Sequence, residues 1–410
     1  MKLTHEEQAW LDGREGAALR RAMEILVALG KIYGAKRLIP VVSVQISGVS
    51  YRNLGAAGLE FVRRWVDEGG RVRVPTTLNP AAMDLRAWRE QGFDPTFAAN
   101  QHAVIDAFRR MGVEGGEPSP TCTPYLIGNV PGPGEHIAWA ESSAVSYANS
   151  VLGARTNREG GPGAIAAALT GRTAAYGLHL DEHRRATLRV RVDAEPRTVP
   201  DYSALGAMVG NIARNRVPYF IGLPLQRGTP RWEEKLKALG AAMAATGAVA
   251  LYHVAGVTPE ARQGSMLAPE AETVAITELA PGYAMLNDPV TEIDLVWVGC
   301  PHASLAEIAQ IAGLLKARTL KTPLWITCAR PVKEAAHSLE LAPVIEEAGG
   351  RLIADACMAI APVRDLGFET VATSSAKAAF YLRNLAGVAA RFGTLEQCVE
   401  AAVRGTWRTA

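Results

Sequence analysis

The sequence predicts an α/β protein, because short runs of β-branched residues that end in polar loops alternate with segments of helical periodicity. The alternation is clearest in the C-terminal third, where we expect strands at 294–299, 324–327, 352–355 and 370–373 and helices at 305–316 and 376–385. Composition agrees, since 48% of the 410 residues are hydrophobic and 20% are charged, as in a globular chain with a large core. Ligands of α/β proteins bind beyond the carboxyl ends of strands, so functional residues are expected there.

The preceding two thirds of the chain show the same order less regularly. Residues 5–33 have apolar positions at helical spacing. The run from Leu38 to Val44 predicts a strand that ends in the polar stretch QISGVSY, before a helix near 56–68. Further expected elements are a strand within 72–80, an alternating strand at 188–192, a helix at 232–246 and a strand at 249–254.

The balance of charge argues against binding to nucleic acid or to an acidic membrane surface. Lys and Arg number 43 and Asp and Glu 41, which leaves a formal charge of +2. The N-terminus lacks the pattern of a secretory signal, and the uncharged stretch between Lys237 and Glu260 is too poor in apolar bulk for a membrane span. We therefore expect a cytoplasmic protein with no nucleic acid and no membrane partner, whose five cysteines stay reduced.

Four cysteines occupy comparable positions in the predicted fold. Cys300, Cys328 and Cys357 each end an expected strand, and Cys122 lies in the loop TCTPY. Thiols at one edge of a parallel sheet can point into one cleft, and three thiolates can hold an iron–sulfur cluster or zinc. The competing interpretation is that each is an ordinary buried thiol, which we expect for Cys398 within the last helix.

A dense set of polar residues follows in NSVLGARTNREGGPG, residues 149–163. Pro162 suits the first turn of a helix, so Arg155 and Arg158 lie where an anion is favoured. Carboxylate or phosphate binds guanidinium groups of this kind, although a charged surface loop has the same composition. No Walker motif and no GxGxxG motif is present, which argues against nucleotide chemistry.

The segment ATSSAKAAFY offers further donors for an acid. Ser374, Ser375 and Lys377 lie at the start of the last expected helix but one, where the serines also suit a capping role. Among the histidines, His302 follows Cys300 closely. His179 and His183 have the spacing of a metal pair on a helix, yet the surrounding residues predict a loop, so a solvated or core position is expected for both.

These pieces together resemble the large chain of the aconitase X family. The resemblance is carried over almost the whole chain by QISGVSY, TCTPYLIGN, ESSAVSYANSVLGARTNREGG, YGLHLDEHR, VGCPHASLAEI and the pairing of ADACM with TSSAKAAFY. It implies an aconitase-like architecture of three α/β lobes around a cleft, which we place at 1–195, 196–290 and 291–410. In this family a swivelling domain closes the cleft. We find no remaining segment of this sequence that would form it, so the resemblance implies a small partner subunit.

The resemblance also implies a cofactor. It makes Cys122, Cys300 and Cys357 the ligands of an iron–sulfur cluster and leaves Cys328 out, a distinction that strand ends alone do not make. Three ligands fit a three-iron or four-iron cluster best, and also a two-iron cluster with an unusual donor. The iron without a protein ligand then acts as a Lewis acid on the hydroxyl of a bound acid.

Roles for other residues follow from the same resemblance. Arg155, Arg158 and Lys377 are predicted to form a cationic cradle for the substrate carboxylate, and His302 is a proton relay candidate. The catalytic base is expected on the partner chain, as a serine. The predicted orienting hydrogen-bonding residues are Gln45, Ser47, Asn149, Ser150, Asn157 and Ser375.

The function implied is the dehydration of a small hydroxy acid by a hydro-lyase. We favour mevalonate 5-phosphate, converted to trans-anhydromevalonate 5-phosphate, over cis-3-hydroxy-L-proline, because paired arginines suit a phosphate and the separate large chain is typical of that enzyme. Two alternatives of other classes are a cluster-sensing regulator that binds nucleic acid and a zinc hydrolase that uses His179 and His183. Iron with acid-labile sulfide, or zinc alone, distinguishes the dehydratase from the hydrolase.

Overall fold

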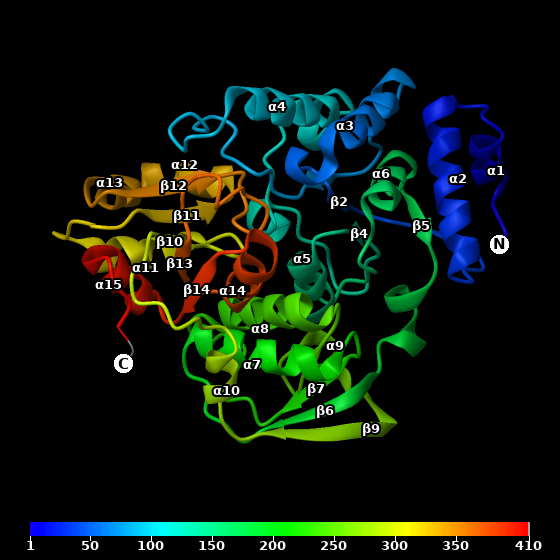
Figure 1. Cartoon of the computed structure of the whole chain (residues 1–410). Helices are drawn as coiled ribbons and strands as arrows, with labels where there is room; N and C mark the ends of the chain where they lie inside the picture. Colours follow the sequence, from blue (N-terminus) through cyan, green and yellow to red (C-terminus); the bar gives the residue numbers. More distant parts are fainter. Residues whose placement is uncertain (409–410) are drawn as a thin grey trace.

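The computed structural model describes residues 1–408 and confirms the predicted α/β class. The N-terminal part contains two small sheets covered by helices (Figure 1). Its elements are α1 (His5–Leu11), α2 (Ala17–Ile32), β1 (Leu38–Pro40), β2 (Val44–Ile46), α3 (Tyr51–Asp67), β3 (Thr76–Leu78), α4 (Pro95–Arg110), η2 (Pro124–Ile127), β4 (Ala138–Trp139), α5 (Ser142–Tyr147), η3 (Ala148–Leu152), α6 (Gly161–Thr170) and β5 (Arg172–Ala174).

Two predicted elements of this part are each divided in the structure. The helix expected over 5–33 breaks between α1 and α2, where Gly13 and Gly16 adopt φ of 80° and 104°, a region that favours glycine. The strand expected from Leu38 to Val44 is two strands in different sheets, since β1 pairs antiparallel with β5 and β2 pairs parallel with β3 and β4.

The middle part is a parallel four-stranded sheet in the order β8-β7-β6-β9, with α7 and α8 packed together beside it (Figure 1). Its elements are β6 (Ala186–Val192), α7 (Val199–Ala213), β7 (Pro218–Ile221), α8 (Trp232–Gly247), β8 (His253–Val254), α9 (Pro259–Gln263), β9 (Leu267–Ile276) and α10 (Ala280–Ala284). This sheet includes β6, which precedes the lobe boundary predicted at 195; the three lobe limits themselves stay a prediction.

The C-terminal part is a parallel five-stranded sheet in the order β12-β11-β10-β13-β14. The order reverses direction between β10 and β13, which is where ligands bind in open α/β sheets. Its elements are β10 (Leu295–Val298), α11 (Leu305–Leu315), β11 (Leu324–Cys328), α12 (Arg330–Ser338), α13 (Leu341–Glu347), β12 (Gly350–Ala354), β13 (Thr370–Thr373), α14 (Ala376–Tyr381), β14 (Ala389–Phe392) and α15 (Leu395–Arg404).

The carboxyl edges of the first and last parts face each other. A parallel bridge joins Ala81, just beyond β3, to Ala356, just beyond β12. The N–H of Ala81 donates to the carbonyl of Asp355 at 2.7 Å, and the carbonyl of Ala81 accepts from the N–H of Cys357 at 3.1 Å. Residues that follow strands of both sheets are thereby brought to one place.

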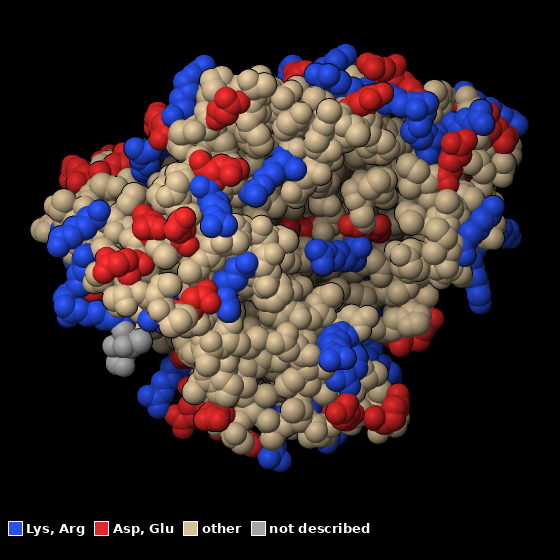
Figure 2. Space-filling model, viewed as in Figure 1, with Lys and Arg blue, Asp and Glu red and all other residues tan. Residues whose placement is uncertain are grey.

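Charged side chains do not form a single-sign surface on the face shown in Figure 2, where basic and acidic groups are interspersed. Within residues 1–408, no helix has both the length and the apolar character needed to cross a membrane.

Candidate active site

Three of the cysteines lie together where the first and last parts meet. Cys300 follows β10, Cys357 follows β12, and Cys122 lies in the loop before η2. The Cys122 sulfur accepts the backbone N–H of His302 at 3.2 Å, which places it against the Cys300 turn. Burial raises the pKa of all three thiols, and the pKa of Cys122 is raised further by Cys357 and Cys300. Thiols 235 residues apart in the chain thus share one site, in which Cys122 and Cys300 are buried and Cys357 is half-buried.

His302 ties the backbone of this site together. Its Nε2 donates to the carbonyl of Ala356 at 2.7 Å, so its Nδ1 accepts from the Thr121 hydroxyl at 2.8 Å. Burial lowers the pKa of His302 to about 4, and the imidazole is neutral near pH 7. Both ring nitrogens are therefore hydrogen-bonded, which fixes the orientation of the ring, and the role of His302 as a proton relay stays a prediction.

The donor set fits an iron–sulfur cluster better than a single ion. No three His, Cys, Asp or Glu side chains among residues 1–408 converge closely enough to hold one metal ion. A cluster of several irons spaces its thiolate ligands more widely. Among the buried polar atoms that have no partner within the described chain are Gln45 Oε1, Ser50 Oγ and Asn79 Oδ1. Unpaired buried atoms of this kind indicate a site built for a polar ligand.

A buried ion pair lies next to the thiols. Lys377, on α14, pairs its ammonium with Glu141 and donates to Ser143 Oγ at 3.1 Å. Burial alone would raise the pKa of Glu141, but the charge of Lys377 outweighs it and lowers this pKa to about 2. The pKa of Lys377 is raised, because Glu141 and the thiols at Cys300 and Cys122 outweigh its burial. Both groups are therefore charged at neutral pH.

Glu141 and Asn79 are site residues that the sequence analysis missed. Asn79 Nδ2 donates to Glu141 Oε2 at 2.9 Å, and each follows a strand of the N-terminal sheet, β3 for Asn79 and β4 for Glu141. Because each residue follows a strand, its position could in principle have indicated a site residue. The strands are only three and two residues long, however, and β4 has too few residues to show a pattern.

The structure brings Gln45, Ser375 and Ser47 toward this region in different ways. Gln45 is fully buried and donates to the carbonyl of Thr121, next to Cys122, at 2.9 Å. Ser375 caps α14 by accepting the N–H of Ala378 at 3.1 Å, as the capping interpretation expects. Ser47 is half-buried in the turn after β2.

Three of the predicted orienting residues form hydrogen bonds with other groups of the protein, namely Asn149, Ser150 and Asn157. Asn149 binds both the N–H and the carbonyl of Thr156, at 3.0 and 2.9 Å. Ser150 Oγ accepts the N–H of Tyr252 at 2.9 Å, and Asn157 is held by the backbone of Tyr176 and Leu178. These hydrogen bonds give the three side chains a structural role in shaping the loop, and their contact with substrate stays a prediction.

The two arginines of the loop are placed differently. The Arg155 guanidinium pairs with Asp181 and donates to the carbonyl of His179 at 3.2 Å, so its charge is already compensated. Arg158 is exposed and makes no hydrogen bond or ion pair among residues 1–408. The predicted three-membered cradle is thus not assembled in the structure, which leaves Lys377 beside the thiols.

The remaining cysteines and histidines lie elsewhere. Cys328 is fully buried in the core under the C-terminal sheet, and Cys398 is buried in α15. His179 is buried against His136, with the two Nδ1 atoms 3.1 Å apart, whereas His183 is exposed. The described chain therefore contains no ligand set for the zinc hydrolase alternative.

The fold and the buried thiols define an aconitase-like protein. The crystal structure of Thermococcus kodakaraensis aconitase X, in its holo-form, superposes with a TM-score of 0.90 at 47% identity, covering 98% of this chain and 100% of that one. Sequence models of the first, second and third domains of aconitase X match residues 1–182, 186–280 and 293–404. The chain belongs to the aconitase X family, and the resemblance noted in its motifs is confirmed.

Named relatives divide into two activities. A protein of Methanocaldococcus jannaschii called phosphomevalonate dehydratase large subunit is 48% identical, with 98% of this chain and 100% of that protein covered. A protein of the same name from Methanothermobacter thermautotrophicus is 49% identical over 94% and 95%. The cis-3-hydroxy-L-proline dehydratase of Pseudomonas aeruginosa is 39% identical, with 97% of this chain but 69% of that protein covered.

Proposed function

We propose that this chain is the large catalytic subunit of an iron–sulfur hydro-lyase that converts mevalonate 5-phosphate to trans-anhydromevalonate 5-phosphate. The observation that carries the substrate is the 48% identity, over the full length of both chains, to a relative named phosphomevalonate dehydratase large subunit. The relatives named for hydroxyproline are less similar, and this chain spans about 70% of their length. A small subunit that closes the cleft completes the proposed enzyme, which works in the cytoplasm, where thiols remain reduced.

Cys122, Cys300 and Cys357 would hold the cluster, since they share one site between the two sheet edges. When bound, an aconitase-like cluster supplies a Lewis-acidic iron that stabilises departing hydroxide. The protein contributes burial, which excludes water and strengthens every charge interaction in the site. Bound substrate would satisfy the unpaired atoms of Gln45, Ser50 and Asn79.

Lys377 is the cation that we propose stabilises the substrate carboxylate. Charge on that carboxylate increases as the neighbouring carbon loses its proton, and a fixed ammonium stabilises this change without reorganisation. Glu141 holds the ammonium in place and keeps it protonated. Arg158, exposed and uncompensated among the described residues, is the proposed contact for the phosphate, and the base that removes the proton is proposed on the small subunit.

The test is turnover of the anaerobically purified two-chain complex on the two purified substrates. We expect loss of water from mevalonate 5-phosphate and no reaction with cis-3-hydroxy-L-proline. Activity on hydroxyproline alone would assign the other activity of the family and contradict the proposed substrate.

The cluster ligands are tested separately by metal content. Replacing Cys122, Cys300 or Cys357 by Ser should remove most iron and acid-labile sulfide, together with visible absorbance. Cys328→Ala is the control, because this thiol is buried in the core, away from the other three, and the variant should retain both. Full iron content in any of the three Ser variants would remove that residue from the ligand set.

A further inference from the structure

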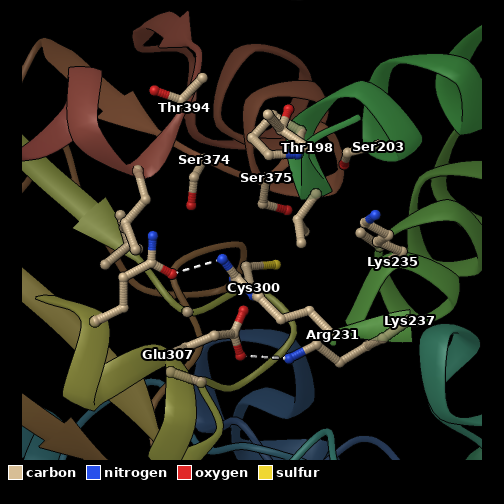
Figure 3. Close-up of a pocket in the computed structure, with 18 of the residues that line it drawn as sticks. Thr198, Ser203, Arg231, Lys235, Lys237, Cys300, Glu307, Ser374, Ser375 and Thr394 are labelled. Atoms are coloured by element: carbon tan, nitrogen blue, oxygen red, sulfur yellow. Dashed lines mark hydrogen bonds and ion pairs between the residues drawn. The ribbon is translucent and has the colours of Figure 1, made fainter. Parts of the chain in front are cut away.

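The described residues that line the cavity beside Cys300 carry no uncompensated positive charge. This cavity of about 280 Å³ belongs to the candidate active site, since Cys300 and Ser375 line it (Figure 3). Its cationic lining residues are Arg197, Arg231, Lys235 and Lys237, and its carboxylates are Glu307 and Glu396. Three of the cations pair with glutamates, as Lys237 does with Glu307 at 2.7 Å in Figure 3, and Glu396 offsets Lys235. A phosphate contact is therefore better supplied by Arg158, in the loop 149–159.

Arg158 combines an exposed side chain with a backbone that is held on both sides. Its neighbours Asn157 and Glu159 are both buried. The Asn157 side chain forms hydrogen bonds with two backbone groups, at 3.0 and 2.8 Å. The N–H of Glu159 donates to the carbonyl of Trp139 at 2.9 Å, in the strand that Glu141 follows closely. The point from which the Arg158 side chain extends is thereby fixed relative to a residue of the candidate active site.

Arg184, which precedes β6, holds the first half of this loop. Its fully buried guanidinium donates to Asn149 Oδ1 at 3.1 Å and to the carbonyls of Asn149 and Ala154, both at 3.2 Å. It also donates to the carbonyl of Leu178 at 2.9 Å. Glu260, on α9, accepts the two remaining bonds at 2.7 and 2.8 Å and compensates the charge. All three guanidinium nitrogens are therefore hydrogen-bonded within the protein.

Two of these partners carry the restraint on towards Arg158. Asn149 Oδ1, which accepts from Arg184, also accepts the N–H of Thr156 at 3.0 Å. Leu178 accepts from Arg184 through its carbonyl and donates its N–H to Asn157 Oδ1 at 2.8 Å. Both chains of hydrogen bonds begin at one guanidinium and end at the two residues that precede Arg158.

Only an arginine can make this set of contacts. A guanidinium is a planar fork that reaches acceptors in several fixed directions, whereas a lysine ammonium is a point charge with fewer donors. Arg184 ends the segment YGLHLDEHR, to which none of the roles described above assigns a function beyond its place in the fold. The contacts of Arg184 give this segment one, because they tie it to the loop that carries Arg158.

We propose that Arg184 is a positioning residue, which places Arg158 for contact with the phosphate group of the substrate. This inference rests on the proposed function, because it takes a phosphorylated hydroxy acid as the substrate. A loop held in its binding conformation before the substrate arrives avoids the entropic cost of ordering it on binding. The phosphate lies away from the carbon that loses its proton, so loss of Arg184 should raise KM more than it lowers kcat.

The experiment is steady-state kinetics of the two-chain complex on mevalonate 5-phosphate, with Arg184→Lys, Arg158→Ala and the double variant. Arg184→Lys keeps a charge opposite Glu260 but loses the fork. We expect each single variant to raise KM about tenfold with kcat within about twofold of the parent, through loss of a charge-assisted contact. If Arg184 acts through Arg158, the double variant should have the KM of Arg158→Ala alone.

Arg216→Lys is the matched control. Arg216 likewise donates to a glutamate, Glu272, at 2.7 Å and to the backbone carbonyls of Ile212 and Ala213, at 2.8 and 3.0 Å. None of these partners belongs to the loop 149–159, so KM should not change. Glu260→Gln is a second variant for the case in which Arg184→Lys does not fold, because it weakens the hold on Arg184 and should raise KM in the same direction.

Hydrogen–deuterium exchange of the full chain gives a readout that needs no turnover. Arg184→Lys should speed amide exchange in peptides that cover residues 149–159, and Arg216→Lys should not. Unchanged exchange in this loop, or effects on KM that multiply in the double variant, would overturn the positioning role. Absence of turnover by the parent complex would instead overturn the proposed substrate, and with it the phosphate contact of Arg158, whatever the exchange of the loop.

Discussion

Lys377 and Glu141 are charged groups removed almost entirely from water, so each depends on the other. Removing one partner of such a pair typically costs about 3–5 kcal/mol, whereas removing both is much less destabilising. Substitutions in this pair are therefore expected to affect two separate properties, stability and catalytic rate. The free energy of unfolding reports the charge balance, and the rate reports the presence of the ammonium.

A variant pair separates these properties. Lys377→Met should lower kcat/KM at least about 100-fold, because it removes a cation that stabilises developing charge. It should also lower the free energy of unfolding by about 3 kcal/mol, since Glu141, whose side chain is 13% exposed, is left without its cation. The double variant with Glu141→Gln should regain stability in urea denaturation but not activity. Recovery of activity in the double variant would show that Lys377 acts only through stability.

Glu159 introduces a pH dependence of stability. Burial raises its pKa to about 7 from 4.5, and Thr173 Oγ1 donates to its Oε1 at 2.9 Å. The folded chain therefore keeps a proton that the unfolded chain releases above pH 4.5, so the contribution of Glu159 to the free energy of unfolding falls as pH rises to about 7. The loss amounts to about 3 kcal/mol, at about 1.4 kcal/mol per pH unit.

Glu159→Gln should remove this dependence. The amide keeps an acceptor for Thr173 and carries no charge, so the variant should be more stable than the parent at pH 8, by up to about 3 kcal/mol. The difference should disappear near pH 4.5, where the parent is also protonated. Urea denaturation at several pH values measures it, and a constant difference across the range would contradict the assigned titration.

At the scale of elements, the site depends on how the turn after β12 is held to the N-terminal part. Arg330, at the start of α12, pairs with Asp355 and, at 2.8 Å, with Asp84. Asp84 also accepts the N–H of Ala354 at 2.9 Å. These contacts join the segment after β3 to the end of β12, three residues before Cys357. A fixed position for Cys357 relative to Cys122 follows from this link.

Arg330→Met tests the link. It leaves the buried carboxylate of Asp355 without its cation and should lower the free energy of unfolding by about 3 kcal/mol. It should also lower iron and sulfide content, because Cys357 loses its fixed position. Arg86→Ala is the matched control, since its 3.4 Å pair with Glu334 is 71% and 61% exposed and should contribute less than about 1 kcal/mol. Equal effects of the two variants would contradict the proposed role of Arg330.

For the whole molecule, the decisive feature is that the thiols, Lys377 and Glu141 come from different parts of the chain. We propose that the base for proton removal lies on a small subunit, so we expect the reaction to need both chains. Adding that subunit should raise turnover at least about 100-fold over the large chain alone, the order of a missing general base. Steady-state assays at increasing subunit ratio measure this, and full activity of the large chain alone would place the base within it.

Much of the site was predictable from residues that follow strands. Cys300 and Cys357 were found in this way, and Cys122 was found as a thiol in a polar loop. The same pattern could not separate Cys328 from them, because a strand end looks alike whether its side chain points to the cleft or to the core. Glu141 was missed because β4 is two residues long and leaves no periodicity to detect.

The roles assigned to the 149–159 loop illustrate a different limit. Its polar residues were recognised, but sequence cannot show which hydrogen bonds a side chain has already made. Asn149 and Asn157 bind backbone groups, and Arg155 binds Asp181, so all three are already engaged by the protein. These partners lie 7 to 101 residues away, or on another element, and were invisible to local pattern.

By itself the sequence determined the α/β class, most C-terminal strands and helices, the aconitase X family and a short set of candidate thiols, because propensity, periodicity and motif are local properties of the chain. Tertiary structure alone decided which strand ends meet. The order β12-β11-β10-β13-β14 and the bridge from Ala81 to Ala356 bring distant turns to one edge. Such long-range pairing depends on packing between whole sheets, and no short stretch of sequence encodes it.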